Sequence, residues 1–237
     1  MQRLIHLHLN LLFLYLLFGC FLVLFLLIVS TIQLEKKEVV VDSVELFHNN
    51  SSNKVFVLLG DSVLKNDSYV KSGLSVSGYV KSQMSSSYCY AINDSNIVDI
   101  YNQLEQVPID YNDTTCFIFL SVGGNDILNS KTVDKDLLNP VFIAYTKLIR
   151  SIRTKMDKSK IFLINIYYPL GLKYSQYRPV LEEWNKMIDD FAYNSTNNIS
   201  GVIKLSGLLK QESDFTYGIE PSESGGLKIA TAICLTQ

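Results

Sequence analysis

The sequence predicts one three-layer α/β/α domain, built on a five-stranded parallel sheet and preceded by a single transmembrane helix. Three observations lead to this prediction. From residue 54 onward, short β-branched runs alternate with longer amphipathic ones, which is typical of βαβ units around a parallel sheet. The short runs are apolar almost throughout, as in strands that helices cover on both faces. Near the N-terminus, residues Leu11–Ile32 contain no charged side chain.

The uncharged segment Leu11–Ile32 has the length of a membrane-spanning helix. At about 1.5 Å per residue it covers roughly the 30 Å of a bilayer's hydrocarbon core. A cleaved signal peptide is the alternative, but its apolar region would be about 7–15 residues long and would end in small residues. We therefore expect residues 1–33 to form a cytoplasmic stub and a membrane anchor, residues 34–53 a stalk, and residues 54–237 the folded domain.

Asn-x-Ser/Thr sequons indicate that the domain of this single-pass membrane protein faces the lumen or the cell exterior. The positive-charge rule does not decide the orientation, because Arg3 precedes the segment while Lys36 and Lys37 follow it. One sequon, at Asn93, would place a glycan beside the site described below. The candidate glycosylation sites are Asn49, Asn50, Asn66, Asn112, Asn194 and Asn198.

Charge and cysteine usage argue against two classes of function. The net charge is −2 and there is no basic cluster, so a nucleic acid is not the expected partner. Outside the membrane segment the cysteines are Cys89, Cys116 and Cys234, which cannot all pair within one chain and which lack the spacing of metal ligands. We expect buried thiols, no metal and no cofactor.

The expected strands are residues 55–60, 88–92, 116–122, 161–168 and 201–205. The expected helices are residues 96–106, 135–156, 176–193 and 222–233. Residues 63–82 are harder to interpret, because Gly73 and Gly78 interrupt the helical pattern. In parallel sheets of this kind ligands bind at the carboxyl ends of the strands, so the residues that follow each strand are the candidates for a site.

Two polar turns follow the first and third expected strands. The first, Gly60-Asp61-Ser62, places a serine where a helix N-terminus favours negative charge, which suits a nucleophile, although such a serine is more often a plain helix cap. The second, Gly123–Asp126, combines two glycines that permit a tight turn with an amide, Asn125, that can donate to an oxyanion. Together, at neighbouring strand ends, the two turns are more specific than either alone.

From about Val55 to Ile233 the chain resembles the SGNH hydrolases, the GDSL-type esterases and lipases. Gly60-Asp61-Ser62 matches the first block of that family, residues 91–104 its second, Gly123–Asp126 its Gly-x-Asn-Asp block and residues 217–233 its fifth. The resemblance implies a flavodoxin-like fold in which Ser62 attacks an ester carbonyl after a histidine takes its proton. It also implies that an aspartate three residues before the histidine orients it.

The same resemblance implies an oxyanion site made by Ser62, Gly124, Asn125 and residue 94, but three positions depart from the family pattern. Glu220 occupies the place of the histidine, and Tyr217 that of the aspartate. Asp94 stands where the second block has glycine, although its backbone N–H can still donate. The histidines of the chain, which are His6, His8 and His48, all precede the domain.

Two hypotheses follow. In the first, the protein is a membrane-anchored, hydrolase-like protein, catalytically impaired or inactive, that binds an acylated or glycan ligand or a protein partner. In the second, it is an active serine esterase or acyltransferase in which Ser62 uses a non-standard base, Glu220 or Lys65. Burial can raise the pKa of a carboxyl group toward the working pH of a base. Lys65 follows Ser62 with Ser-x-x-Lys spacing, although a solvated lysine is the plainer interpretation. A purely structural membrane protein is the third possibility.

Overall fold

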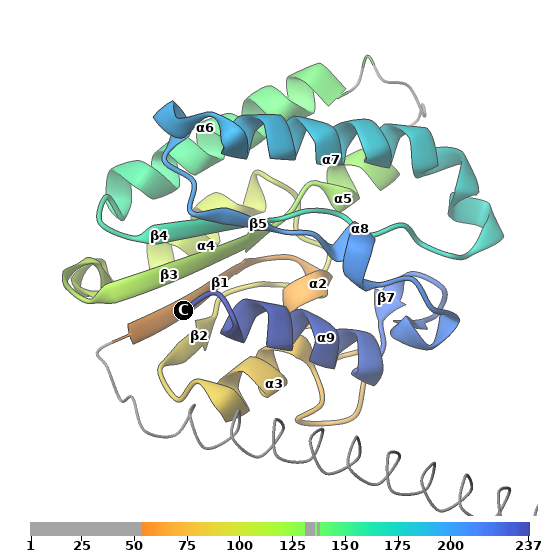
Figure 1. The fold of residues 1–237 in the computed structure, drawn as a ribbon, viewed down its shortest axis with the longest axis horizontal. Coiled ribbons are helices and arrows are strands. Elements are labelled where there is room, and N and C mark those ends of the chain that lie inside the picture. Colours follow the sequence, from red (N-terminus) through yellow and green to blue (C-terminus); the bar gives the residue numbers. More distant parts are fainter. Residues whose placement is uncertain (1–53, 131–135, 137) are drawn as a thin grey trace, which may run out of the picture. The chain divides into compact units, whose positions relative to one another are not determined.

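Five parallel strands form the sheet at the centre of the folded unit, in the order β2-β1-β3-β4-β5 (Figure 1). The sheet, with helices on both faces, confirms the predicted three-layer class. The longest ladder joins β1 to β3, from Lys54 opposite Thr115 to Gly60 opposite Ser121. The strands are β1 (Lys54–Gly60), β2 (Ser87–Cys89), β3 (Thr115–Ser121), β4 (Lys160–Ile164) and β5 (Gly201–Ile203).

The computed structural model describes residues 54–130, 136 and 138–237, which belong to one unit, Asn53–Gln237. The predicted transmembrane helix, the predicted stalk and the sequons at Asn49 and Asn50 lie outside the described residues. Among the residues that are described, no helix combines the length and the hydropathy that a membrane span requires.

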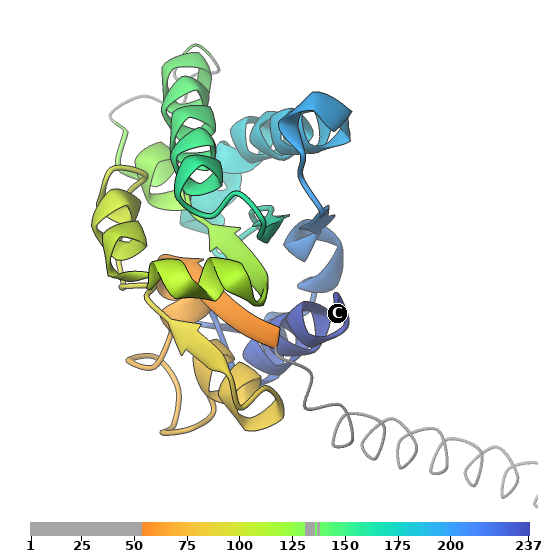
Figure 2. The same ribbon diagram turned by 90° about the vertical axis from the view of Figure 1, so that its left-hand side faces the viewer.

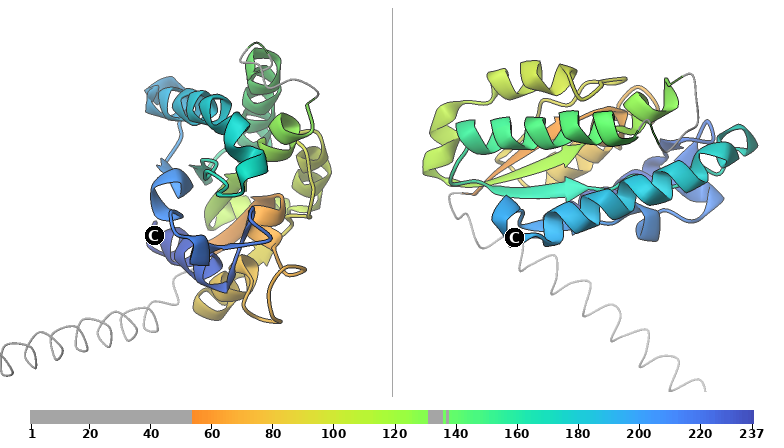
Figure 3. Two further views of the ribbon diagram at one scale, coloured as in Figure 1. Left: turned by 90° about the vertical axis from the view of Figure 1, so that its right-hand side faces the viewer. Right: turned by 90° about the horizontal axis from the view of Figure 1, so that it is seen from above.

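Helices cover both faces of the sheet (Figures 2 and 3). The face covered by α4, α6 and α7 and the face covered by α3 and α9 each have their own apolar core. The α-helices are α2 (Ser62–Lys65), α3 (Val76–Gln83), α4 (Asp99–Gln106), α5 (Gly124–Leu128), α6 (Leu138–Lys155), α7 (Arg178–Tyr193), α8 (Leu205–Leu208) and α9 (Glu223–Cys234). The 3-10 helices are η1 (Ile109–Asp113), η3 (Leu172–Tyr177), η4 (Ser195–Asn197) and η5 (Glu212–Asp214).

The two cores differ in side-chain type because alternate residues of a strand point to opposite faces. Toward α3 and α9 the strands present a stacked row of aromatic rings, with the centroids of Phe56 and Phe117 5.1 Å apart. Phe119 and Phe162 continue this row, with their centroids 5.4 Å apart. Toward α4, α6 and α7 the strands present aliphatic side chains, which pack around the fully buried Trp184. Both faces are buried, as the apolar runs of the sequence predict.

All five predicted strands are present, but the second and fifth end before the expected residues 92 and 205, and the fourth is shorter than the expected residues 161–168. The backbone hydrogen bonds of the fourth strand end here because a buried side chain takes over the bonding of the next backbone groups. The amide of Asn185 in α7 accepts a hydrogen bond from Ile166 N at 2.9 Å and donates one to Ile166 O at 2.7 Å. The ambiguous segment 63–82 holds two helices, α2 and α3, on either side of Gly73. The thiols of Cys116 and Cys234 are buried and free, whereas that of Cys89 is free but only half-buried.

Besides the short helices α5 and α8, a hairpin of two two-residue strands was not predicted, β6 (Phe215–Thr216) and β7 (Glu220–Pro221). Its turn has positive φ at both central residues, 52° at Tyr217 and 76° at Gly218, as a type I′ turn requires. The N–H of Ile219 closes the turn on Thr216 O at 3.2 Å. Two residues per strand are too few to give a recognisable alternation in the sequence.

The turn between β3 and α5 depends on a glycine. Gly123 has a φ of 110°, in the left-handed region that side chains disfavour. A Cβ atom built there would lie 2.5 Å from Cζ2 of the buried Trp184. Close contact with Trp184 and positive φ therefore both exclude a side chain at this position.

We expect Gly123→Ala to lower the free energy of unfolding by about 2 kcal/mol or more, through left-handed strain of roughly 1–2 kcal/mol and overpacking of about 1–3 kcal/mol. Urea denaturation followed by circular dichroism measures the effect. Gly207→Ala in α8 is the matched control, because a Cβ there meets no atom within 4 Å. Equal midpoints for the two variants would contradict the proposed role of Gly123.

Candidate active site

The predicted catalytic serine lies in a small pocket at the carboxyl ends of β1, β3 and β4. The cavity has a volume of about 40 Å³. It brings together Ser62, Gly124, Asn125 and Glu220 from the sequence prediction, whereas Lys65 and Asp94 do not line it. The lining residues are Asp61, Ser62, Val63, Ser121, Val122, Gly124, Asn125, Leu128, Asn165, Ile166, Tyr167, Pro169, Leu181, Ile219 and Glu220.

Ser62 begins the short helix α2, directly after strand β1. Asp61 caps this helix, because its Oδ1 accepts a hydrogen bond from Val63 N at 3.1 Å. At Gly60 the backbone approaches β3 so closely that a Cβ would lie 2.2 Å from Ser121 O. The serine is thereby held in a tight strand-to-helix turn, and its side chain faces the pocket.

A glutamine that the sequence analysis missed fixes this turn from behind. Gln103 of α4 is fully buried. Its Nε2 donates to Gly60 O at 2.8 Å and to Ser95 Oγ at 3.1 Å, and its Oε1 accepts from Gly60 N at 2.8 Å. A polar residue on the apolar face of an amphipathic helix was the signal available in the sequence. Gln103 therefore joins the serine turn to the loop that contains Asp94.

Asn125 and Asp126 anchor the same loop from the other side. Asn125 Nδ2 donates to Ser95 O at 3.1 Å, and the Asp126 carboxylate accepts from Ile97 N at 3.2 Å. An amide nitrogen carries two hydrogens, and no described residue uses the second one of Asn125. Because Asn125 lines the pocket, this second N–H is suitable for holding an oxyanion.

Asp94, at the position where the family pattern has glycine, has a left-handed backbone conformation. Its φ is 61°, a left-handed value that aspartate tolerates better than most side chains. The side chain is exposed, yet its charge raises the pKa values of Glu220 and Tyr69. Its participation in the oxyanion site stays a prediction.

The β6–β7 hairpin carries Glu220 to the pocket, where it pairs with Thr216 across the hairpin. Tyr217, at the place of the family's aspartate, points the other way. Its side chain is 76% exposed, and its ring lies edge-on to Tyr69, with the centroids 6.3 Å apart. The residue that should orient the base therefore lies at the surface.

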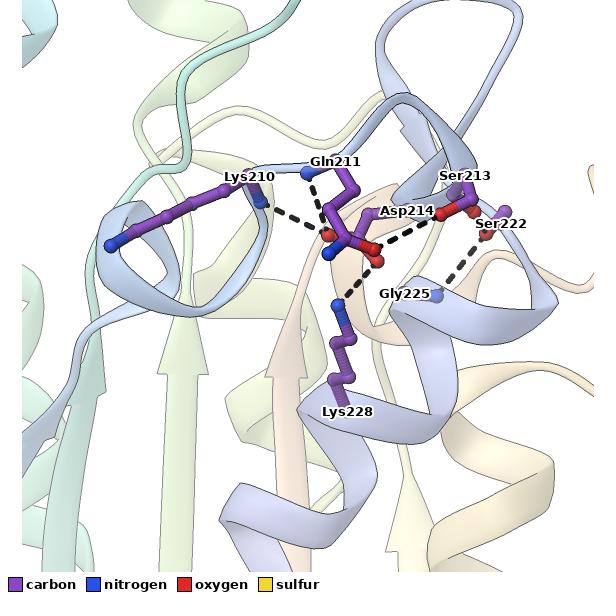
Figure 4. A network of polar contacts seen from close by, with 7 residues as sticks. All are labelled: Lys210, Gln211, Ser213, Asp214, Ser222, Gly225 and Lys228. Atoms are coloured by element: carbon purple, nitrogen blue, oxygen red, sulfur yellow. Dashed lines mark hydrogen bonds and ion pairs between the residues drawn. The ribbon is translucent and has the colours of Figure 1, made fainter. Parts of the chain in front are cut away.

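A buried ion pair closes the base of the hairpin (Figure 4). Lys228 Nζ of α9 lies 2.6 Å from Oδ1 of Asp214, whose side chain is completely buried. Asp214 Oδ2 accepts hydrogen bonds at 3.0 Å from the backbone N–H groups of Lys210 and Gln211. Burial alone would raise the pKa of Asp214, but these hydrogen bonds lower it. Ser222 N donates to Asp214 O at 2.9 Å, so the two ends of the hairpin meet.

The carboxyl group of Glu220 interacts with Ser62. Burial raises its pKa, a side-chain hydrogen bond with Ser62 opposes this rise, and the charge of Asp94 adds to it. Its second oxygen, Oε2, is buried and has no hydrogen-bond partner among the described residues. The pKa of Asp61 is raised to about 7, chiefly by burial and in addition by the charge of Glu220, against the hydrogen bond from Val63 N–H. Carboxyl groups whose neutral form is favoured therefore gather around Ser62.

Lys65 is paired elsewhere. Its Nζ lies 3.0 Å from Oδ2 of Asp67, and the hydrogen bond with Asp67 raises the pKa of the amine. A lysine base needs a lowered pKa and access to the serine. Of the two alternative bases, the geometry favours Glu220.

The sequons differ in accessibility. Asn66 is completely buried and its Nδ2 donates to Pro221 O at 3.0 Å, which corrects the expectation of a glycan there, because this nitrogen would carry the sugar. Asn112 Nδ2 is engaged with Asp157 at 2.5 Å. Asn194 and Asn198 are exposed, and their glycosylation stays a prediction.

No protein-family model matches the sequence, and no curated protein matches it. Solved structures do match. A lipase from a goat rumen metagenome is similar with a TM-score of 0.63 and 17% identity, over 78% of this chain and 97% of that one. A member of the lipolytic G-D-S-L family from Veillonella parvula is similar with a TM-score of 0.59 and 18% identity, over 77% and 97% of the two chains.

A third match is a variant of an acetyl-xylooligosaccharide esterase from Geobacillus Stearmophilus, with a TM-score of 0.59 and 14% identity over 79% of this chain and 94% of that one. Identities this low establish the fold alone. The folded unit therefore has the SGNH fold of the GDSL-like lipases and acylhydrolases, as its sequence motifs predict.

Proposed function

We propose that this domain binds small acyl esters in the pocket beside Ser62 and turns them over very little. The observation that carries the proposal is the position of Glu220, whose carboxyl group stands beside Ser62 where a hydrolase has its histidine. The pocket is retained, whereas the group that would activate the serine is replaced.

Several features support ester binding. The serine turn and the Asn125 amide keep the arrangement that holds an ester carbonyl, and aliphatic side chains such as Leu128, Ile166 and Leu181 form one wall. A volume of about 40 Å³ suits an acetyl-sized group better than a long acyl chain. An acetyl group carried on a glycan combines the two ligand classes predicted from the sequence, and one structural neighbour is an acetyl-xylooligosaccharide esterase.

The chemistry of Glu220 supports weak turnover. An ordinary glutamate, with a pKa near 4.5, is a weaker base than an ordinary histidine, with a pKa near 6.5. A catalytic base also needs a third group to orient it, and Glu220 Oε2 has no such partner among the described residues. The charges of Asp61 and Asp94 nearby oppose a developing oxyanion, which needs positive potential.

A specific observation favours a second function, slow acyl transfer with Glu220 as the base. Glu220 lines the same pocket as Ser62, and a carboxyl group beside the serine is what such a base requires. In that case the rate should rise as the pH passes upward through the raised pKa of Glu220, because only the ionised carboxylate accepts a proton.

The location of the domain is also a proposal. The uncharged segment Leu11–Ile32 would anchor the protein in a membrane, with the domain on the lumenal or outer side. Resistance of the full chain to alkaline extraction from membranes, together with protection of the domain from protease in sealed vesicles, is the expected result.

We expect a fluorophosphonate probe to label the wild-type protein slowly or not at all, and Glu220→His combined with Tyr217→Asp to increase labelling at least about 10-fold. General bases contribute roughly 10²–10⁴-fold to rates, and Glu220→His supplies an imidazole base beside Ser62, while Tyr217→Asp restores the residue type of the family pattern in the turn. Gel fluorescence after timed exposure measures the rate.

Two variants make this experiment decisive. Ser62→Ala should abolish all labelling in either background. Glu220→Gln should leave the wild-type rate unchanged if Glu220 is not a base, whereas a fall to the Ser62→Ala level would establish slow acyl transfer instead.

Ligand binding can be tested separately from turnover. Saturation-transfer NMR on acetylated xylobiose should show contact with the acetyl methyl groups in the wild-type protein, and Gly124→Leu should remove it. The nearest side-chain atom to a Cβ at Gly124 is Ile166 Cδ1, at 3.8 Å, so a leucine there would fill the pocket. Gly207→Leu, away from the pocket, is the control. An unaltered signal in Gly124→Leu would place the ligand elsewhere.

Asp61 should make stability depend on pH. In the folded protein its pKa of about 7 lies above the ordinary 3.8. Its contribution to the free energy of unfolding is therefore complete below about pH 3.8 and is lost as the pH rises through about 7. About three pKa units at 1.36 kcal/mol each set an upper limit of roughly 4 kcal/mol.

Asp61→Asn keeps an acceptor for Val63 N–H and removes the charge. We expect it to be more stable than the wild type at pH 8 and to show a smaller gain at pH 5, measured as urea midpoints. The exposed Asp190→Asn serves as the control. Parallel curves for wild type and Asp61→Asn would show that Asp61 ionises normally.

A further inference from the structure

Asn66 ends the short helix that begins with Ser62. Its backbone N–H donates to Ser62 O at 2.9 Å, and its side chain is completely buried. Its φ of 26° lies on the left-handed side of the map, where asparagine is one of the few tolerated side chains. The main chain thus turns away from the nucleophile at this residue.

The amide of Asn66 bridges two further segments. Its Nδ2 donates to Pro221 O at 3.0 Å, and its Oδ1 accepts from Val76 N at 2.7 Å. Pro221 directly follows Glu220 in β7, and Val76 is the first residue of α3. One side chain therefore connects the helix of the nucleophile to the residue next to the carboxylate that faces it.

The hairpin needs such support. Isolated hairpins are marginally stable in water, and β6 and β7 have two residues each. The Asp214–Lys228 pair holds its base, while the side chain of Asn66 bonds the backbone of β7 to the end of the serine helix. Both contacts act at the base of the hairpin, where Phe215 pairs with Pro221, and that of Asn66 links this base to the helix of Ser62.

We propose that Asn66 is a positioning residue, which fixes Glu220 against Ser62 by holding the backbone beside each of them. This inference rests on the Ser62–Glu220 pair of the proposed function and adds the group that maintains it. Asparagine is suited to the role because it supplies a donor and an acceptor at once. Aspartate would supply only the acceptor, and glycine neither.

The same atom would carry the sugar if the sequon Asn66-Asp67-Ser68 were glycosylated. Nδ2 of Asn66 is buried and bonded to Pro221 O, so a glycan there would break the bridge. A folded domain with Glu220 in the pocket therefore has an unmodified Asn66.

The test measures the titration of the Glu220 carboxyl group by NMR in the purified full chain. The glutamate carboxyl carbons are labelled with ¹³C, and the signal of Glu220 is assigned as the one that Glu220→Gln removes. In Asn66→Gly, which keeps the backbone turn and removes the amide, the titration midpoint of Glu220 should fall toward the ordinary 4.5 as water enters. Asn198→Gly is the matched control, since Asn198 also has positive φ, 52°, but is exposed and distant in sequence. It should leave the midpoint unchanged.

The second readout is Ser62 labelling in the Glu220→His, Tyr217→Asp background, where Asn66→Gly should slow the reaction at least about 10-fold, because small misplacements of catalytic groups are costly. Absence of labelling in every variant would refute the expectation that Glu220→His with Tyr217→Asp activates Ser62. The titration of Glu220 would still test the role of Asn66. An unchanged midpoint in folded Asn66→Gly would overturn the inference.

If Asn66→Gly does not fold, Asn66→Asp replaces it, because it keeps the shape of the side chain and the acceptor for Val76 N. The readout is then hydrogen exchange of the Ile219 amide, which closes the hairpin turn, relative to amides of β3. At least about 10-fold faster exchange at Ile219 alone supports the inference, and equal exchange contradicts it.

Discussion

The hydrogen-bonded ladder between β1 and β3 is the constraint on which the site depends. Its register places Gly60 opposite Ser121, so the two chains leave the sheet at the same level and in the same direction. Asp61 N continues the ladder to Ser121 O at 3.2 Å. The serine turn and the Asn125 turn must therefore lie side by side, and a shift of one residue would turn every strand side chain to the opposite face.

Buried side-chain amides fix the backbone segments that the β1–β3 ladder does not hold. Gln103 holds the backbone before Ser62, Asn66 holds the backbone after it, and Asn185 fixes the strand end that leads to Tyr167. Each amide satisfies both a donor and an acceptor of the main chain, so burial costs little and replacement leaves backbone groups unpaired. The site is thus shaped by three neutral side chains, while its charged residues are carboxylates.

The proposed weak turnover depends on the carboxyl groups that gather around Ser62. A histidine becomes positive when it takes a proton, which helps to stabilise an oxyanion, whereas a glutamate only becomes neutral. The raised pKa values of Glu220 and Asp61 show that the fold accommodates these groups at an electrostatic cost. This electrostatic cost is one reason for the proposal that the pocket holds an ester more readily than it converts one.

The sequence by itself determined the five strands, the two-sided core and the two turns that contain Ser62 and Asn125, because periodicity and turn residues are local properties. It also identified Glu220 as the residue at the histidine position. The tertiary structure decided that Glu220 faces Ser62, that Tyr217 points to solvent and that Lys65 pairs with Asp67. It also decided the roles of Gln103 and Asn66, whose partners lie 43 and 155 residues away. Such contacts depend on how distant segments pack, which no local pattern encodes.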